Sequence, residues 1–327
     1  MVNKKLHFEE IDICKGIAIL LVVIYHAFIR YPINLVEVPW CNYIMDVIRS
    51  FFMPLFFVLS GFLFAKTSDK RYAHVMSSKF KRLLVPMLSY EFVTLFIKMA
   101  FPSVINRKVI GTGDYLMKII TMGGGEMWFV YVLFLIFVIW GYFLPRMRKW
   151  MIIIAIVVFQ VLHFTIGGFE NNIFLNDRIF YFSTFFLLGY ISHDFIRTIL
   201  SKNCFLYVYA FLFIIINIVM IQHLPVVIKW LSVAQIVGVL FCWSLSFSLV
   251  GKKYSGFLTY CGKYSLQFYI FNGFALVPAR VFMCNVFHVT HPVVLWVCIS
   301  IMSIVGIIVV TELCKRIKYV NIAFGIK

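Results

Sequence analysis

The first apolar run, residues 11–31, carries four ionisable side chains along one side of a predicted helix. Lys15 and His26 are eleven residues apart, and Asp12 and Arg30 are eighteen apart. At about 100° per residue, both spacings return to within roughly 20° of one face. Ionisable groups are costly inside a membrane, so such residues are candidates for function by default. We expect this polar stripe to face the interior of a helical bundle or a water-filled cavity.

His26 is the member of the stripe with the clearest chemistry. Imidazole titrates near neutral pH and can take a proton from a hydroxyl that attacks a carbonyl carbon. Structural explanations also exist. Asp12, Lys15 and Arg30 lie near the ends of the run, where charged groups reach the interface at little cost. A neutral His26 could simply hydrogen-bond a neighbouring helix, so its position alone leaves both explanations open.

The second apolar run contains several residues with structural or chemical potential. Asp46 and Arg49 are three residues apart and can pair on one helix face. Pro54 removes a backbone donor and is expected to kink the helix. The pair Ser60-Gly61 permits close approach of another helix. A nucleophilic role for Ser60 would need a nearby base.

Three cations, Lys79, Lys81 and Arg82, stand just before the third apolar run. One explanation is anchoring at the cytoplasmic surface of the membrane. The alternative is binding of a polyanion, such as the phosphates of a nucleotide-containing cofactor.

Other polar residues lie inside or beside the apolar runs. Glu91 and Lys98 are seven residues apart and share one helix face. The longest predicted loop, residues 102–126, contains a run of three glycines at 123–125. That run is either a flexible turn or part of a re-entrant segment that lines a cavity. The remaining candidates are Glu126, Trp128, Gln235, Gln267, Asn272 and Arg280.

The composition indicates that lipid is the solvent of most of this chain. Of its 327 residues, 63% are hydrophobic and 13% are charged, whereas soluble domains average near half apolar and a quarter charged. A spanning helix needs roughly 20 apolar residues. Ten such runs lie near 11–31, 43–65, 83–101, 127–144, 150–167, 179–195, 204–222, 229–250, 265–285 and 293–314. The sequence therefore predicts an all-α, polytopic membrane bundle of about ten transmembrane helices, with residues 1–327 as a single transmembrane domain.

The basic residues orient this predicted bundle. With the N-terminus in the cytoplasm, 21 of the 30 lysine and arginine residues fall in inner segments and 9 fall elsewhere. This bias is the one that the positive-inside rule describes, so both termini are predicted to be cytoplasmic. Because the net charge of +17 follows the short loops, it does not indicate a nucleic-acid partner.

The cysteines and the N-terminal segment bear on metal binding, disulfide formation and a signal peptide. The eight cysteines include no Cys-x-x-Cys pair and no His/Cys metal spacing, so no metal is expected. A disulfide between Cys41 and Cys284 is the alternative to cysteine as a small buried apolar residue, which we favour. The apolar run that follows Lys4 and Lys5 is too long for a signal peptide and lacks a cleavage site, so it is predicted to be the first membrane helix.

Several of these motifs together resemble the membrane acyltransferase 3 family, which includes bacterial enzymes that acylate sugars of surface polysaccharides. The resemblance covers nearly the whole chain and is most specific in residues 9–90. The motifs that carry it are Lys15-x10-His26, the run Met53–Phe62, Lys79-x-x-Arg82, Trp128-Phe129-Val130 and Gly262-x-x-Ser265-Leu266-x-x-Tyr269.

The resemblance implies transfer of an acyl group, by default acetyl, from cytoplasmic acyl-coenzyme A to a hydroxyl of a sugar or glycan. It implies a multi-pass protein of a bacterial inner (plasma) membrane. In this scheme His26 is the general base, and Asp12 or Glu91 orients cations or substrate. The donor-binding candidates are Lys15, Lys79, Arg82, Ser60 and Trp128.

The sequence departs from the family's pattern at three positions. Lysine replaces the commoner arginine at Lys15 and Lys79, which keeps the charge but loses the bidentate geometry of a guanidinium. Asn272 stands where many relatives carry histidine, so no role is assigned to it. We also expect no soluble esterase-like domain of the kind that some relatives carry.

A different class of protein is the main alternative. A bundle of ten helices with a polar stripe would also suit a transporter or exporter of a glycan or a lipid-linked sugar. Many such transporters are built from inverted repeats, and no internal repeat is visible in this sequence. The identity of the acceptor and the oligomeric state stay open at this level.

Overall fold

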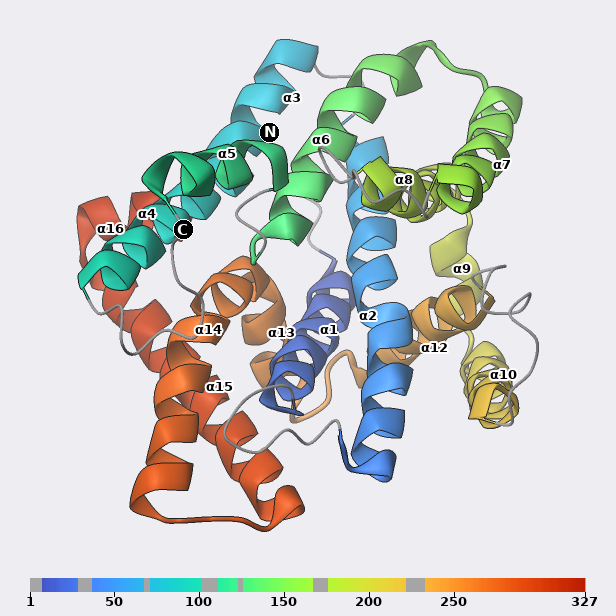
Figure 1. Cartoon of the computed structure of the whole chain (residues 1–327). Helices are drawn as coiled ribbons and strands as arrows, with labels where there is room; N and C mark the ends of the chain where they lie inside the picture. The colour runs from blue at the N-terminus through green and yellow to red at the C-terminus, as the bar shows by residue number, and fades with distance from the viewer. Residues whose placement is uncertain are drawn as a thin grey trace. The chain divides into compact units, whose positions relative to one another are not determined.

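The computed structural model describes residues 8–28, 37–67, 71–100, 111–122, 126–166, 176–221 and 233–326, and every regular element within them is helical (Figure 1). The predicted all-α fold class is therefore confirmed. Each of the ten predicted apolar runs coincides with a helix. These helices are α1 (Glu9–Phe28), α2 (Pro39–Ala65), α4 (Val85–Ala100), α6 (Trp128–Phe143), α7 (Lys149–Ile166), α8 (Asn176–Ile191), α10 (Asn203–Ile221), α12 (Val233–Leu249), α14 (Ser265–Val281) and α15 (Pro292–Arg316).

Five helices in the described residues are long and apolar enough to cross a bilayer. They are α1, α2, α15, α6 together with the following 3₁₀ turn η3 (Leu144–Arg146), and α14 together with the π turn η5 (Phe282–Val286). Much of α7, α10 and α12 is also apolar, although shorter. The count of ten spans and the cytoplasmic placement of both termini stay predictions.

Short helices occupy segments that the sequence suggested were only loops. They are α3 (Tyr72–Lys79), α5 (Thr112–Met122), α9 (Ile196–Leu200), α13 (Ser255–Lys263) and α16 (Lys318–Ala323), with a π turn η2 (Phe80–Leu84) between α3 and α4. Lys4, Lys5, Arg30 and the glycine run at 123–125 lie outside the described residues, as does the side chain of Lys98.

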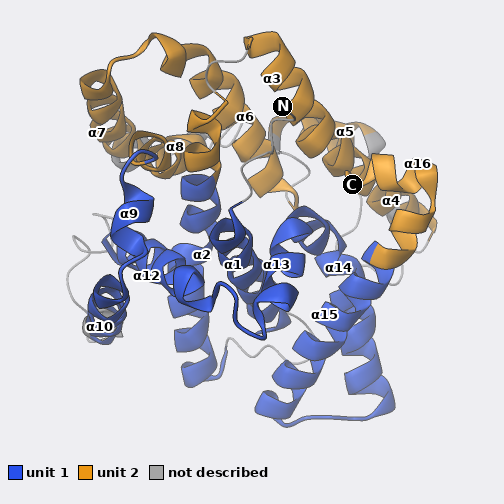
Figure 2. Cartoon of the chain, turned by 180° about the vertical axis from the view of Figure 1, so that it is seen from behind, with its two compact units in different colours: residues 1–59, 193–311 blue, residues 60–192, 312–327 orange. Residues whose placement is uncertain are grey.

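The chain forms two compact units, which Figure 2 colours separately. Unit 1 comprises residues 1–59 and 193–311, and it contains α1, most of α2, α9, α10, α12, α13, α14, η5 and most of α15. Unit 2 comprises residues 60–192 and 312–327, and it contains the end of α2, the helices from α3 to α8, the end of α15 and α16.

Helix α10 in unit 1 exposes an apolar side that suits contact with lipid. Tyr207, Phe211, Ile214 and Ile218 are all exposed, and their spacing of three and four residues places them on one face of the helix. An exposed apolar stripe of this length is unfavourable in water, so it supports the membrane environment inferred from composition.

Helix α15 exposes apolar side chains and buries small hydroxyl-bearing ones beside Leu295, Ile299 and Ile307. Val297, Ile301 and Val305 are exposed, whereas Ser303 and Thr311 are fully buried. Where lipid is the solvent, burying apolar side chains gives no hydrophobic gain between helices, and small residues are favoured at the contacts because they allow close packing.

Helices α1 and α13 cross at two glycines within unit 1. A Cβ atom on Gly16 would lie 2.0 Å from the Leu258 carbonyl oxygen, and one on Gly262 would lie 1.7 Å from the Asp12 carbonyl oxygen. Only glycine allows the two backbones to approach this closely. The crossing thus holds the segment of α1 that carries Asp12 and Lys15 against α13.

A similar contact joins α2 and α8 within unit 2. A Cβ atom on Gly61 would lie 1.9 Å from the Phe186 carbonyl oxygen. Next to this contact Phe64 packs against Phe137 and Phe186, with ring centroids 5.6 and 5.7 Å away. The close approach predicted at Ser60-Gly61 is therefore confirmed.

The glycine crossing of α1 and α13 predicts a position-specific cost of adding one methyl group. Gly262→Ala should lower the stability of the folded protein by about 1–3 kcal/mol or more, because the new Cβ overlaps backbone atoms that cannot rotate away. Thermal unfolding in detergent, followed by size-exclusion chromatography, measures the change. Gly256→Ala on the same helix is the control, since a Cβ there meets no atom within 4 Å. Equal melting curves for the two variants would contradict this account of the crossing.

Candidate active site

Helix α1 carries three of the candidate residues of unit 1, namely Asp12, Lys15 and His26. Its first turn holds Glu9, Glu10 and Asp12, and acidic residues there interact favourably with the positive end of the helix dipole. Asp12 Oδ1 lies 3.5 Å from Lys15 Nζ, and both side chains are largely buried. Asp12 therefore helps to fix the position of the Lys15 ammonium group.

A long-range ion pair fixes the beginning of the same helix. Arg197 Nε donates to Glu10 Oε1 at 2.7 Å, and the Arg197 guanidinium also lies 4.4 Å from the centre of the Phe8 ring. Glu10 is buried, so its charge requires such a partner. The contact ties α1 to the start of α9 within unit 1.

His26 lies half-buried in the last turn of α1. Its Nδ1–H donates to the Val22 carbonyl oxygen at 2.7 Å. Since a carbonyl can only accept, this bond assigns the proton of the neutral ring to Nδ1 and the lone pair to Nε2. A histidine in this tautomer is arranged to accept a proton at Nε2.

In unit 2, Lys79 ends α3 and Arg82 lies in the π turn η2 that follows. The Lys79 ammonium lies 3.7 Å from the centre of the Phe137 ring, which favours a cation through the ring quadrupole. The Arg82 side chain is exposed. Single π turns are rare and are often found at functional sites, which distinguishes this segment from an ordinary basic loop.

Glu91 belongs to a cluster of two carboxylates and two phenols in unit 2. Tyr115 donates its hydroxyl to Glu91 Oε2 at 2.6 Å, and Tyr90 donates to Glu126 Oε2. Glu91 is only 2% exposed. Burial, and then the Glu91 carboxylate that accepts its bond, raise the pKa of Tyr115 on α5 well above its usual range. Tyr115 therefore stays a hydrogen-bond donor throughout the physiological pH range.

Trp128 begins α6, and Ser60 lies next to the close contact at Gly61. The Trp128 ring stacks on Phe182 with a centroid distance of 5.7 Å, and the Arg178 guanidinium lies 4.3 Å from its centre. Trp128 and Ser60 are both half-buried. The Trp128 indole therefore contacts both an aromatic and a cationic partner.

The predicted site residues fall into two groups. Asp12, Lys15 and His26 share α1 in unit 1, whereas Ser60, Lys79, Arg82, Glu91 and Trp128 belong to unit 2. Sequence reasoning missed Tyr115, which donates to Glu91, and Arg178, which lies over Trp128. It also missed Tyr90 and Arg197, the partners of Glu126 and Glu10. Only Tyr90 had a signal in the sequence, because it stands directly beside Glu91 and shares its turn of helix.

Several other sequence predictions can be compared with the structure. Arg49 donates to Asp46 at 2.6 Å, so this predicted pair is confirmed. All eight cysteines lie in described residues and are free thiols, which agrees with cysteine as an apolar residue and not with a bond between Cys41 and Cys284. Asn272 on α14 is buried, and its Oδ1 accepts no hydrogen bond from the described residues.

The fold and these residues define a class of protein before any comparison is made. An all-helical membrane-type bundle that holds a histidine in a base-competent tautomer, with a lysine on the same helix and further cations at a π turn, is suited to group transfer. The sequence pattern of the acyltransferase 3 family, an acyltransferase domain, matches residues 8–312. The chain therefore belongs to the acyltransferase 3 family and is a membrane acyltransferase. No curated protein and no solved structure gives a significant match.

The bond between Tyr115 and Glu91 predicts a measurable contribution to stability. Tyr115→Phe removes one hydrogen bond to a buried carboxylate, so the free energy of unfolding should fall by about 1.5–3 kcal/mol. Tyr142→Phe is the control, because Tyr142 is exposed and its ring contacts with Arg146 are kept. Thermal unfolding of both variants in detergent checks the difference, and an unchanged Tyr115→Phe protein would rule out a structural role for the bond.

Proposed function

We propose that this protein is a membrane-bound O-acyltransferase that moves an acyl group from cytoplasmic acyl-coenzyme A to a hydroxyl of a sugar or surface glycan. Acetyl is the proposed acyl group, and a bacterial inner membrane is the proposed location. The observation that carries the proposal is the His26 tautomer. The histidine of the family motif bonds its own helix through Nδ1, which puts the proton of the neutral ring on Nδ1 and the accepting lone pair on Nε2.

The spacing along α1 supports the use of a long donor. Eleven residues of helix separate Lys15 from His26, which is about 16 Å at 1.5 Å per residue. Lys15, held by Asp12 at one end of α1, would bind a phosphate of the donor. The extended arm of coenzyme A would carry the acyl group along the helix toward His26.

The cations of unit 2 are proposed as a second set of donor-binding residues. Lys79 lies at the end of α3 and Arg82 lies in the π turn η2, where its side chain is exposed. The family motif that contains them supports the assignment, and their charge suits phosphate groups. Ser60 and Trp128 are assigned to the same function on the strength of their motifs.

Asp12 and Glu91 are proposed to orient other groups of the site. Asp12 orients Lys15 through their contact at 3.5 Å. Glu91 is assigned to hold substrate or a neighbouring cation, and its bond from Tyr115 keeps the carboxylate in one orientation. Lipid, acyl-coenzyme A and a glycan acceptor are the partners of the proposed enzyme. Membership of an acyltransferase family favours this function over the transport of a glycan.

Loss of His26 should abolish transfer without removing the protein from the membrane. His26→Ala removes the proposed base, which contributes roughly 10²–10⁴-fold to the rate of such reactions. Purified protein in lipid nanodiscs, with radiolabelled acetyl-coenzyme A and a panel of glycans, measures transfer. His291→Ala is the matched control, because His291 is an exposed histidine of the same unit. Full activity of His26→Ala would remove His26 from the mechanism.

Loss of Arg82 should chiefly weaken binding of the donor. Arg82→Ala removes one charge-assisted contact to phosphate, so KM for acetyl-coenzyme A should rise by roughly tenfold while kcat changes little. Arg146→Ala removes an exposed arginine of the same unit and serves as the control. Equal KM values for both variants and the parent protein would return Arg82 to a role in anchoring at the membrane surface.

A further inference from the structure

Arg280 is a buried cation in a membrane-type helix. It lies near the end of α14 and is only 5% exposed. Charged residues inside membrane segments are costly and usually serve a function. The helix continues beyond Val281 as the π turn η5, which is a second uncommon feature that accompanies functional sites. The residue therefore needs an explanation beyond packing.

The contact that Arg280 makes places its guanidinium at the backbone of the residue that follows the proposed base. Its Nη2 donates to the Ala27 carbonyl oxygen at 3.5 Å. Ala27 directly follows His26, and α1 ends one residue later at Phe28. The guanidinium therefore lies at the last turn of α1, which is the turn that presents His26. A cation at a helix C-terminus also interacts favourably with the carbonyl end of the helix dipole, which is the purely structural explanation.

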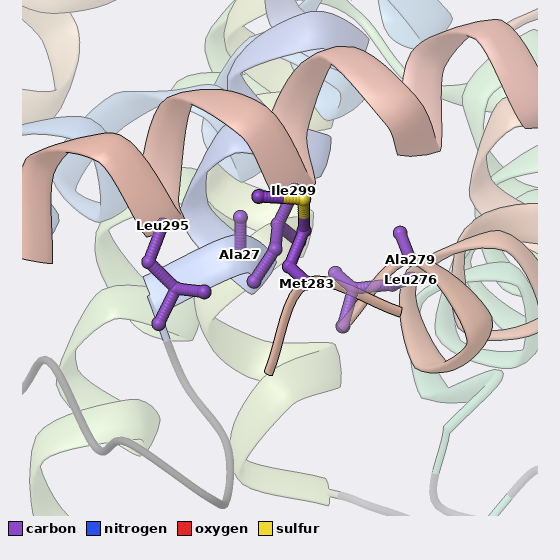
Figure 3. Packing of buried hydrophobic residues seen from close by; sticks show 6 residues of the cluster. All are labelled: Ala27, Leu276, Ala279, Met283, Leu295 and Ile299. Atoms are coloured by element: carbon purple, nitrogen blue, oxygen red, sulfur yellow. The ribbon is translucent and has the colours of Figure 1, made fainter. Parts of the chain in front are cut away.

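The surroundings of this contact are apolar. Figure 3 shows a cluster of buried side chains contributed by α1, α14, η5 and α15. Its members are Ala27, Leu276, Ala279, Met283, Leu295 and Ile299. Ala27 and Ala279 adjoin the Arg280 contact directly. Electrostatic interactions are stronger where polarisable solvent is excluded, so a guanidinium here would act strongly on a developing negative charge.

We propose that Arg280 is a catalytic residue that binds the oxyanion formed during acyl transfer. The inference rests on the proposed function. His26 Nε2 takes the proton of the acceptor hydroxyl as its oxygen bonds to the thioester carbonyl carbon. The π electrons of the C=O bond move to the carbonyl oxygen, and the guanidinium of Arg280 stabilises that oxyanion. The C=O bond then re-forms, the C–S bond breaks, and the leaving thiolate takes the proton from His26.

An arginine is suited to this role for two reasons. Its guanidinium stays protonated, so it donates without taking part in the proton transfers of His26. Its rigid fork of donors can hold the Ala27 carbonyl and direct further N–H groups toward a second oxygen. Removal of one donor to an oxyanion typically lowers kcat by about 10²–10³-fold, a loss that is easily measured.

The test compares Arg280→Met and Arg280→Lys with the parent enzyme in nanodiscs. Arg280→Met should lower kcat at least about 100-fold and leave KM for acetyl-coenzyme A within about twofold. Arg280→Lys keeps a charge and should recover part of the rate. Arg49→Met is the control, because Arg49 is an exposed arginine of the same unit. Normal kcat in Arg280→Met would overturn the proposal.

A second readout separates catalysis from a structural role. Chloroacetyl-coenzyme A forms an oxyanion that its own chlorine stabilises, so its transfer depends less on Arg280 than transfer of acetyl does. The ratio of the chloroacetyl rate to the acetyl rate should therefore be higher in Arg280→Met and Arg280→Lys than in the parent enzyme. If Arg280→Met does not fold, Arg280→Lys provides the test. Its kcat should fall by about tenfold, and its ratio of chloroacetyl to acetyl rate should rise. An unchanged ratio would overturn the proposal. Failure of the proposed function looks different, because the parent enzyme itself would then transfer no acyl group.

Discussion

The cost of placing polar groups in a lipid environment is the constraint on which the rest of this structure depends. Helix α15 exposes valine and isoleucine and buries Ser303 and Thr311, as expected when lipid and not water surrounds the bundle. Under this constraint each buried charge needs an ionic or hydrogen-bonding partner. Glu10 has Arg197, Glu91 has Tyr115, and Lys15 has Asp12. Because burying a charge in lipid is costly, the buried charged residues are the strongest candidates for function in this chain.

Unit 1 combines these charges with close backbone packing along a single helix. Gly16 and Gly262 bring α13 against the first turns of α1, where Lys15 and Asp12 lie. The other end of α1 presents His26 and receives the guanidinium of Arg280. One helix thus carries the cation that we propose binds the donor near one end and the proposed general base near the other. Unit 2 contributes its own cations in a π turn and a network of phenols and carboxylates.

Much of the fold could be predicted from the sequence, because long apolar runs in this chain have few alternatives to helix. The contact at Ser60-Gly61 and the pair Asp46–Arg49 were also readable, since both depend on local spacing. The short helices α5 and α13 were missed because they are amphipathic and lack a long apolar run. The bond from Tyr115 to Glu91 and the contact of Arg280 with the Ala27 carbonyl could not be predicted, because these residues are distant in sequence and only packing brings them near.

We propose that this membrane acyltransferase places an acyl group on a glycan hydroxyl. Mass spectrometry of surface glycans from cells with and without the gene tests it most directly, since it reports the acyl group and the acceptor together. The account predicts a glycan species heavier by one acyl group, expected to be acetyl, only in cells that carry the gene, and removable by mild alkali as an ester. Identical glycan masses in the two strains, with the protein present in the membrane, would contradict it.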